Sequence, residues 1–215
     1  MVLSRFRHFL EFLRSLWPRS AVRLSRKGAH LRDQGKLDEA IAVLDQAISL
    51  SPQLAAAYAY RCTCYCDRQE HTKAIEDANR AIALAPKTAW VYWFRSWSWY
   101  CLDKLDSALA DMDEALRLEP QNASFQHSRA HVLFKLGRID EASAQYDAAL
   151  VQDPKFKKGW LGAMIALKRG KWKEAIELFD VVVEADPSNA RVYCYRGEAW
   201  YRLGKCEDAL RDIDE

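Results

Sequence analysis

Apolar residues recur along most of the chain at spacings of three and four residues, the pattern of an α-helix that buries one side. The pattern repeats in blocks of about 34 residues. Within a block, positions 4, 8 and 11 form one series and positions 20, 24 and 27 form a second, so each block predicts two helices. In four blocks a glycine stands between the two series, where a left-handed residue commonly ends a helix. These glycines are Gly35, Gly137, Gly170 and Gly204.

The prolines set the period of the blocks. Pro52, Pro86, Pro120 and Pro154 are 34 residues apart, and Pro187 follows after 33. Position 20 is alanine in all six blocks and position 8 is mostly small, so the two helices of a block can approach closely while larger neighbours fill the space beside them. One residue is missing from the fifth block near its inter-helix turn, so either Ala163 or Met164 stands at its position 8. The spacing predicts six repeats, the last one truncated, at residues 21–54, 55–88, 89–122, 123–156, 157–189 and 190–215.

With these columns the chain resembles the tetratricopeptide repeat family over Ala21–Glu215. The resemblance implies an all-α fold, a right-handed superhelical solenoid of antiparallel helix pairs. A single pair cannot bury its own apolar face, so stacking of neighbouring pairs supplies the stability. The resemblance also implies a concave groove that is lined mainly by the first helix of each pair.

Positions 7 and 23 change together from one repeat to the next. Where position 7 is arginine, position 23 is aspartate or glutamine, and where position 7 is Lys27 or Ala163, position 23 is Val43 or Leu178. An arginine buried without an acceptor is costly, so the pattern predicts an ion pair between the two helices of a repeat. The predicted pairs are Arg61 with Asp77, Arg95 with Asp111, Arg129 with Gln145, and Arg196 with Asp212.

The N-terminal segment, residues 1–20, has the pattern of an amphipathic helix. Residues 1–36 carry nine Lys and Arg against two Asp and Glu, although the net charge of the whole chain is only +2. Three interpretations stay open: a cap on the first repeat, a peripheral membrane contact through residues 1–19, and an organelle presequence or partner-binding helix. The other end stops within the second helix of repeat six, so we expect either a longer natural chain or association of this uncapped end with another chain, including self-association.

No motif for catalysis, a metal or a cofactor is found. The chain lacks a phosphate-binding glycine loop, a nucleophile elbow and a zinc-protease pattern. His127 and His131 share a helix face without a third ligand, and Cys62 and Cys66 share a face from which Cys64 points away. We therefore predict no enzyme activity, no metal site and no cofactor, and six free thiols in a cytoplasmic protein, with membrane-peripheral localisation as the alternative.

Repeat three is unusually rich in aromatic residues. Packing accounts for Tyr92 and Trp99, at positions 4 and 11, but not for the aromatic residues at positions 2, 5, 6 and 9, which face the concave groove in the family that the chain resembles. Tryptophan and tyrosine are enriched at binding hot spots. We therefore predict a partner-binding surface made of Tyr60, Thr63, Trp90, Trp93, Phe94, Trp97, His127 and His131.

These observations predict a non-catalytic scaffold that binds a peptide or helix of a protein partner. Alternatives are a membrane-peripheral assembly factor and a regulatory fragment of a larger enzyme. Nucleic acid is not an expected partner because basic residues do not alternate with the aromatic ones. Family members that capture the acidic C-terminal tails of chaperones use a carboxylate clamp of lysine, arginine and asparagine. Its positions here carry Ser25, Ala29, Tyr60, Trp90 and Phe94, which disfavours chaperone tails.

Overall fold

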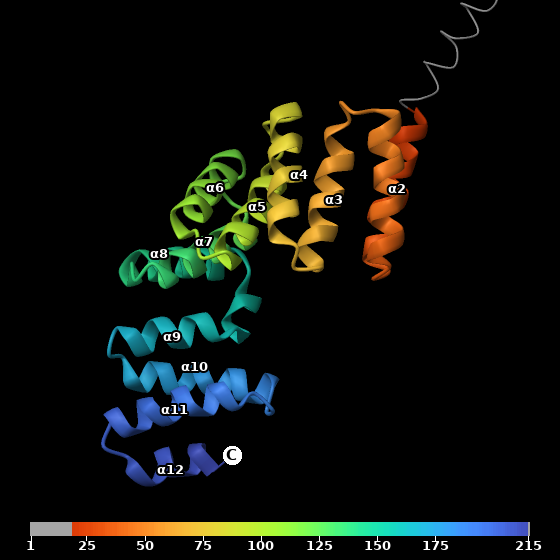
Figure 1. Ribbon diagram of the computed structural model, residues 1–215. Coiled ribbons are helices and arrows are strands. Elements are labelled where there is room, and N and C mark those ends of the chain that lie inside the picture. Colours follow the sequence, from red (N-terminus) through yellow and green to blue (C-terminus); the bar gives the residue numbers. More distant parts are fainter. Residues whose placement is uncertain (1–18, 215) are drawn as a thin grey trace, which may run out of the picture. The chain divides into compact units, whose positions relative to one another are not determined.

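A computed structural model describes residues 19–214 of the chain, in which every regular element is a helix. Residues 19–33 form the first described helix (Figure 1). The predicted amphipathic helix of residues 1–20 lies almost entirely outside the described residues, so its three interpretations stay predictions. The later helices are α2 (Leu37–Leu50), α3 (Ala55–Asp67), α4 (His71–Leu84), α5 (Ala89–Cys101), α6 (Leu105–Leu118), α7 (Ala123–Lys135), α8 (Ile139–Gln152), η1 (Pro154–Lys158), α9 (Trp160–Lys168), α10 (Trp172–Ala185), α11 (Ala190–Arg202) and α12 (Cys206–Asp214).

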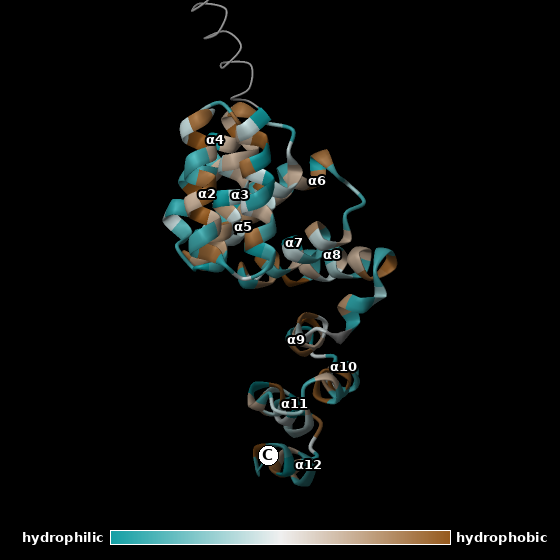
Figure 2. Cartoon of the chain, turned by 90° about the vertical axis from the view of Figure 1, so that its right-hand side faces the viewer, coloured by the Kyte–Doolittle hydropathy of each residue, from teal (hydrophilic) through white to brown (hydrophobic). Residues whose placement is uncertain are grey.

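The chain divides into two compact units, Met1–Leu118 and Glu119–Glu215. Within each unit, helices that are consecutive in sequence lie side by side in antiparallel pairs (Figure 1). Apolar and polar residues lie on different sides of helices such as α2 and α4 (Figure 2), as the spacing of three and four predicts. The predicted all-α arrangement of helix pairs is confirmed for the described residues.

A left-handed residue ends the first helix of each pair. The four predicted glycines have φ between 73° and 77°, and in repeats two and three Gln69 and Asp103 adopt φ of 60° instead. The alanines at position 20 lie where paired helices touch: Ala40, Ala74, Ala108, Ala142 and Ala175 are fully buried, and Ala209 is nearly so. These two features fix the register of each pair and account for the period of the sequence.

The predicted arginine–aspartate pairs form in repeats two, three and six, and each arginine also reaches the preceding repeat. Arg61 on α3 donates through Nε and Nη2 to Asp77 on α4, each at 2.7 Å, and through Nη1 to Asp45 on α2 at 2.5 Å. The arginine therefore joins three helices. The same arrangement places Asp111 and Asn79 around Arg95, and Asp212 and Asp180 around Arg196.

Repeat five departs from this arrangement: the structure places Ala163 at position 8, one of the two residues left open, and so corrects its assignment to position 7. The arginines at position 7 stand eight residues before the left-handed residue of their repeat. Eight residues before Gly170 stands Gly162, not Ala163. Position 25 of one repeat and position 7 of the next are 16 residues apart in the case of Asp45 and Arg61, but only 15 apart in the case of Asp147 and Gly162. The missing residue therefore lies before α9 rather than at the inter-helix turn. The short 3₁₀ helix η1 occupies the place of the first turns of a full-length helix.

Candidate partner-binding surfaces

Six aromatic side chains on α3 and α5 form a cluster in the first unit, which we call the α5 aromatic surface. It consists of Tyr60, Trp90, Trp93, Phe94, Trp97 and Tyr100. Tyr60 stacks on Trp90 with ring centroids 5.8 Å apart, and Trp90 meets Phe94 edge to face at 6.0 Å. Trp93 lies 4.9 Å from Phe94, and Trp97 stacks on Tyr100 at 5.7 Å. Each ring therefore has a neighbour that limits its rotation.

The rings differ in how far they are exposed. Trp97 has 52% of its surface in contact with solvent, whereas the other five are partly buried. Trp90 and Phe94 also pack against the core of repeats two and three. The surface thus has a fixed inner part and an exposed tryptophan that a partner could cover. Tyr100 was missed in the sequence, although it follows Trp97 by three residues and so shares its helix face.

Arg32, on the helix of residues 19–33, lies at the edge of this surface. Its Nε donates to Asp67 Oδ2 on α3 at 2.7 Å, and its guanidinium lies over the Phe94 ring at 5.6 Å. The hydrogen bond with Asp67 raises the pKa of Arg32 above its ordinary value. A permanent positive charge therefore covers one aromatic face, a contact that the sequence analysis did not predict.

Thr63, a predicted member of the surface, is buried. It is 2% exposed, and its hydroxyl donates to the backbone carbonyl of Tyr60 at 2.7 Å. The side chain is thus engaged within its own helix, and we leave it out of the surface proposed below.

His127 and His131 lie in the second unit, within a separate group of rings. His127 stacks on Phe156 at 4.2 Å and meets His131 at 4.7 Å, and His131 lies 5.8 Å from Trp160. Burial lowers the pKa of His127, and burial together with the neighbouring His127 lowers the pKa of His131 to about 4. Both imidazoles are therefore neutral near pH 7. The sequence did not identify Phe156 or Trp160, because both stand where repeat five loses its regular helix.

The thiols at the centre of the first unit are enclosed. Cys62, Cys64 and Cys66 are free and buried, and burial raises the pKa of Cys64 to about 11. Cys66 Sγ lies 3.3 Å from Ser98 Oγ. Within residues 19–214, no three His, Cys, Asp or Glu side chains gather closely enough to hold a metal ion. The geometry favours packing for these cysteines.

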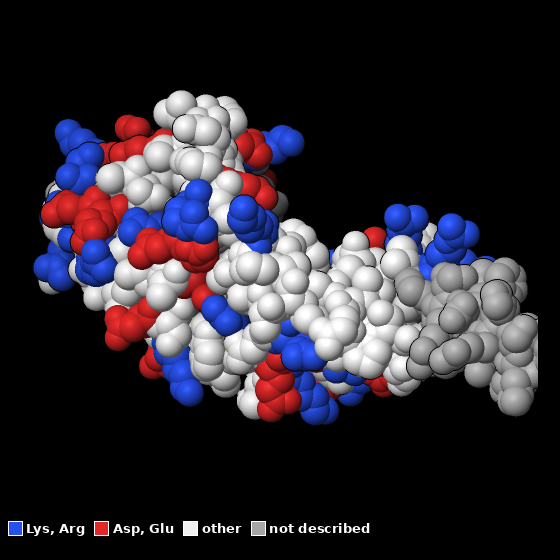
Figure 3. All heavy atoms as spheres, turned by 90° about the horizontal axis from the view of Figure 1, so that it is seen from above, with Lys and Arg blue, Asp and Glu red and all other residues white. Residues whose placement is uncertain are grey.

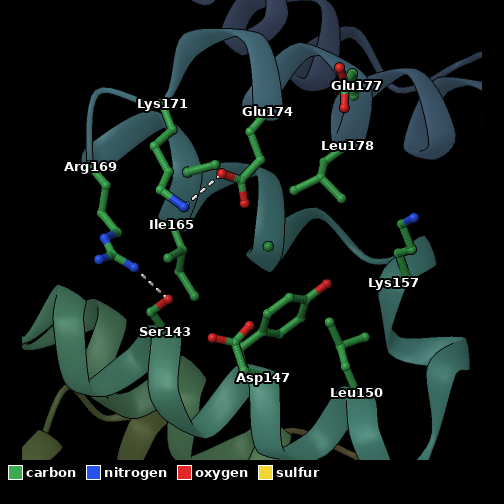
Figure 4. Close-up of a pocket in the computed structure, with 13 residues that line it drawn as sticks. Ser143, Asp147, Leu150, Lys157, Ile165, Arg169, Lys171, Glu174, Glu177 and Leu178 are labelled. Atoms are coloured by element: carbon green, nitrogen blue, oxygen red, sulfur yellow. Dashed lines mark hydrogen bonds and ion pairs between the residues drawn. The ribbon is translucent and has the colours of Figure 1, made fainter.

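A cavity of about 300 Å³ opens between α8 and the helices α9 and α10 (Figure 4). Two polar contacts lie among the residues that line it. Lys171 Nζ lies 2.8 Å from Glu174 Oε2 at the start of α10, and Arg169 Nη1 donates to Ser143 Oγ on α8 at 2.9 Å. Asp147 also lines the cavity. Nothing in the sequence analysis pointed to this cavity, which lies beside the shortened helix α9.

A second cavity, of about 440 Å³, lies between α11 and α12. Its lining includes three exposed apolar side chains, Tyr201, Leu210 and Ile213, which are 61–68% exposed. Repeat six thus exposes apolar side chains among the described residues. Association of this end with another chain stays a prediction.

On the face shown in Figure 3, basic and acidic side chains are interspersed, so that face has no broad basic area of the kind that binds nucleic acid. None of the helices within the described part of the chain has the length and hydropathy needed to cross a bilayer.

Two family profiles match the chain. One, described as TPR repeat, matches residues 28–61 and 165–204, and the other, described as tetratricopeptide repeat, matches residues 102–164. Together they cover well over half of the sequence. No curated protein has a significantly similar sequence.

Solved structures share the fold at low sequence identity. A tetratricopeptide repeat protein from Parabacteroides merdae superposes with a TM-score of 0.73 at 20% identity, covering 91% of this chain and 78% of its own. Pseudomonas aeruginosa pilF gives a TM-score of 0.76 at 17% identity, covering 91% and 90%. YrrB, a tetratricopeptide repeat protein with an unusual peptide-binding site, gives 0.66 at 21% identity, covering 80% and 89%.

The repeat period, the helix pairs with their left-handed turns, the family profiles and the shared fold all agree. The chain belongs to the tetratricopeptide repeat family, whose fold serves in general as a scaffold for protein–protein interaction.

Proposed function

We propose that this protein is a non-catalytic scaffold that binds a peptide or a helix of a protein partner on the α5 aromatic surface. The observation that carries the proposal is the exposure of Trp97 beside partly buried rings that hold one another in place. Large aromatic side chains with few rotatable bonds bury much area and lose little entropy when a partner covers them. An exposed aromatic cluster of this kind is rarely without a role.

The chemistry of the surface favours apolar or arginine-bearing segments as ligands. The indole rings offer apolar area and π faces, and a guanidinium packs well on such faces. Arg32 over Phe94 is an intramolecular example of that contact. The uncharged side chains at the clamp positions, among them the buried Ser25, make acidic chaperone tails poor ligands. YrrB supplies a precedent for peptide binding on the shared fold, although its low identity carries no residue across to this chain.

The experiment that tests this proposal is a peptide selection with matched variants. A random peptide display library is selected on the immobilised chain and on the double variant Trp93→Ala, Trp97→Ala. Tyr201→Ala is the control, because Tyr201 is an aromatic residue of α11 that is 67% exposed and lies outside the surface. We expect peptides with aromatic, aliphatic or arginine anchors that bind the parent and the control but not the double variant. Equal selection on all three proteins would refute the proposal.

A second candidate role is attachment to an anionic membrane surface through residues 1–19. The excess of seven positive charges in residues 1–36 and the amphipathic pattern favour it. Flotation with vesicles that contain or lack anionic lipid, using the chain with and without residues 1–19, tests this role. Binding that needs both the segment and the anionic lipid would support it, and equal flotation without the segment would exclude it. We place the scaffold itself in the cytoplasm.

A further inference from the structure

In repeats two, three and six the arginine at position 7 occupies a site with two acceptors and an aromatic ring. Its guanidinium lies between the acceptor at position 23 of its own repeat and the acceptor at position 25 of the preceding repeat. A tyrosine at position 4 lies beside it: Tyr58 at 5.8 Å from Arg61, Tyr92 at 5.6 Å from Arg95 and Tyr193 at 5.3 Å from Arg196. This chain therefore builds three guanidinium sites from one recurring set of groups.

At the junction of repeats four and five the arginine is absent. Gly162 occupies its position, and Leu178 replaces the aspartate at position 23. Gly162 brings no side chain into the place of the arginine, and a Cβ atom on it would lie only 2.5 Å from Tyr146 Oη. Asp147 nevertheless occupies position 25, the position from which Asp45 and Asp180 each bind the arginine of the following repeat.

The cavity of about 300 Å³ lies at this junction (Figure 4). Asp147 lines it and makes no hydrogen bond or ion pair to any residue that the structure describes. The basic groups around the cavity are mostly engaged: Lys171 pairs with Glu174, and Arg169 binds Ser143 and lies 3.4 Å from Asp140. Lys157 is the remaining basic group of the lining. The cavity thus retains one guanidinium acceptor of the recurring set and a ring, Tyr146, on its wall.

We propose that this cavity binds the guanidinium group of an arginine side chain from a protein partner. Asp147 accepts hydrogen bonds from it, and the Tyr146 ring lies beside its plane. The methylene stem packs along Leu150, Ile165 and Leu178. Arginine suits the site better than lysine because its planar group stacks on a ring while donating to a carboxylate. The inference does not depend on the α5 aromatic surface.

The test uses the full chain and small probes that mimic a peptide arginine. Nα-acetyl-arginine methylamide is titrated into the ¹⁵N-labelled protein, in parallel with the lysine and citrulline analogues. The amide signals of Asp147 and Gly162 are followed. We expect saturable shifts of these signals with the arginine probe, weaker shifts with lysine, and none with the neutral citrulline. Tighter binding of free L-arginine than of the capped probe would indicate that the cavity binds the free amino acid, and would overturn the proposal that the arginine belongs to a protein partner.

Three variants and a control complete the test. Asp147→Asn should weaken binding of the arginine probe about tenfold, because the substitution removes a charged acceptor. Lys157→Gln should strengthen binding of the probe, because it removes a charge of the same sign as the guanidinium. Glu141→Gln, an exposed carboxylate of α8 paired with Arg138 outside the cavity, should leave binding unchanged. The double variant Trp93→Ala, Trp97→Ala should also bind normally. Equal shifts with arginine and citrulline, or undiminished binding by Asp147→Asn, would overturn the proposal.

Discussion

Arg95 on α5 donates two hydrogen bonds to the carboxylate of Asp111 on α6, with N–O distances of 2.8 Å from Nε and 2.5 Å from Nη2. Its Nη1 donates to Asn79 on α4 at 2.7 Å. Asp111 is almost completely buried, so its charge depends on this one guanidinium for compensation. The arginine therefore links the two helices of its own repeat to the repeat before it.

Replacing this arginine should be far more costly than replacing an exposed one. We expect Arg95→Ala to lower the free energy of unfolding by about 3 kcal/mol, because it leaves a buried carboxylate without a partner. Urea denaturation at pH 7 measures the change. Arg117→Ala is the control, since Arg117 pairs with Glu114 on the surface and its loss should cost no more than about 0.5 kcal/mol. Equal losses in the two variants would show that the hydrogen bonds of Arg95 add no stability.

The penalty of Arg95→Ala should also depend on pH. Burial raises the pKa of Asp111, and the hydrogen bonds from Arg95 act in the opposite direction. Without Arg95, burial acts alone and the pKa of Asp111 rises further. A raised pKa in the folded state means that stability is greatest when the group is protonated and falls as the pH increases. The difference in unfolding free energy between parent and variant should therefore shrink from pH 7 to pH 4.5, and a constant difference would contradict this explanation.

Gly162 should not tolerate a side chain. In Gly162→Ala the new Cβ would lie 2.5 Å from Tyr146 Oη and 2.6 Å from its Cζ, so we expect a loss of about 1–3 kcal/mol from overpacking. Gly159→Ala is the matched control, because its nearest neighbour, the carbonyl oxygen of Phe156, would lie at 3.4 Å. Thermal unfolding followed by circular dichroism compares the two. A Gly162→Ala protein as stable as Gly159→Ala would show that Tyr146 moves away freely.

The second unit should lose stability in mild acid through His131. Its pKa is lowered to about 4 in the folded protein, against about 6.5 in an unfolded chain. Stability from the neutral imidazole is thus complete above pH 6.5 and declines as the pH falls towards 4, by about 2 kcal/mol at pH 5. Urea denaturation at pH 7.5 and pH 5 should show a smaller acid loss in His131→Phe than in the parent. His30→Gln, at an exposed histidine, should behave as the parent. If His131→Phe loses as much unfolding free energy between pH 7.5 and pH 5 as the parent does, His131 is excluded as the cause of the acid sensitivity.

The repeat architecture was readable from the sequence because each repeat obeys the same local rules. Prolines end the second helices, alanines lie where helices touch, and left-handed residues end the first helices, so six similar copies reinforce one another. The pairing of Arg61 with Asp77 was also predictable, since both positions change together within the chain. The second acceptor was not, because Asp45 and Asn79 stand at exposed positions that look like an ordinary solvated face.

The register of repeat five could not be read in the same way. Residues 161–167 are all buried, so this helix has no polar side that would mark a missing residue. The aromatic surface was partly predictable from the excess of rings in α5. Thr63 and Trp97 occupy the same position 9 in successive repeats, yet they are 2% and 52% exposed. A threonine reaches much less far from the helix axis than a tryptophan, and position alone does not reveal this difference.

The central claim is that a protein partner binds through Trp93 and Trp97. Its most direct test is the dissociation constant of a peptide selected on the parent protein, measured by isothermal titration calorimetry. The double variant Trp93→Ala, Trp97→Ala should bind this peptide at least about 30-fold more weakly, because each anchor at a hot spot contributes 1 kcal/mol or more. The same dissociation constant in parent and double variant, with both proteins folded by circular dichroism, would contradict the account.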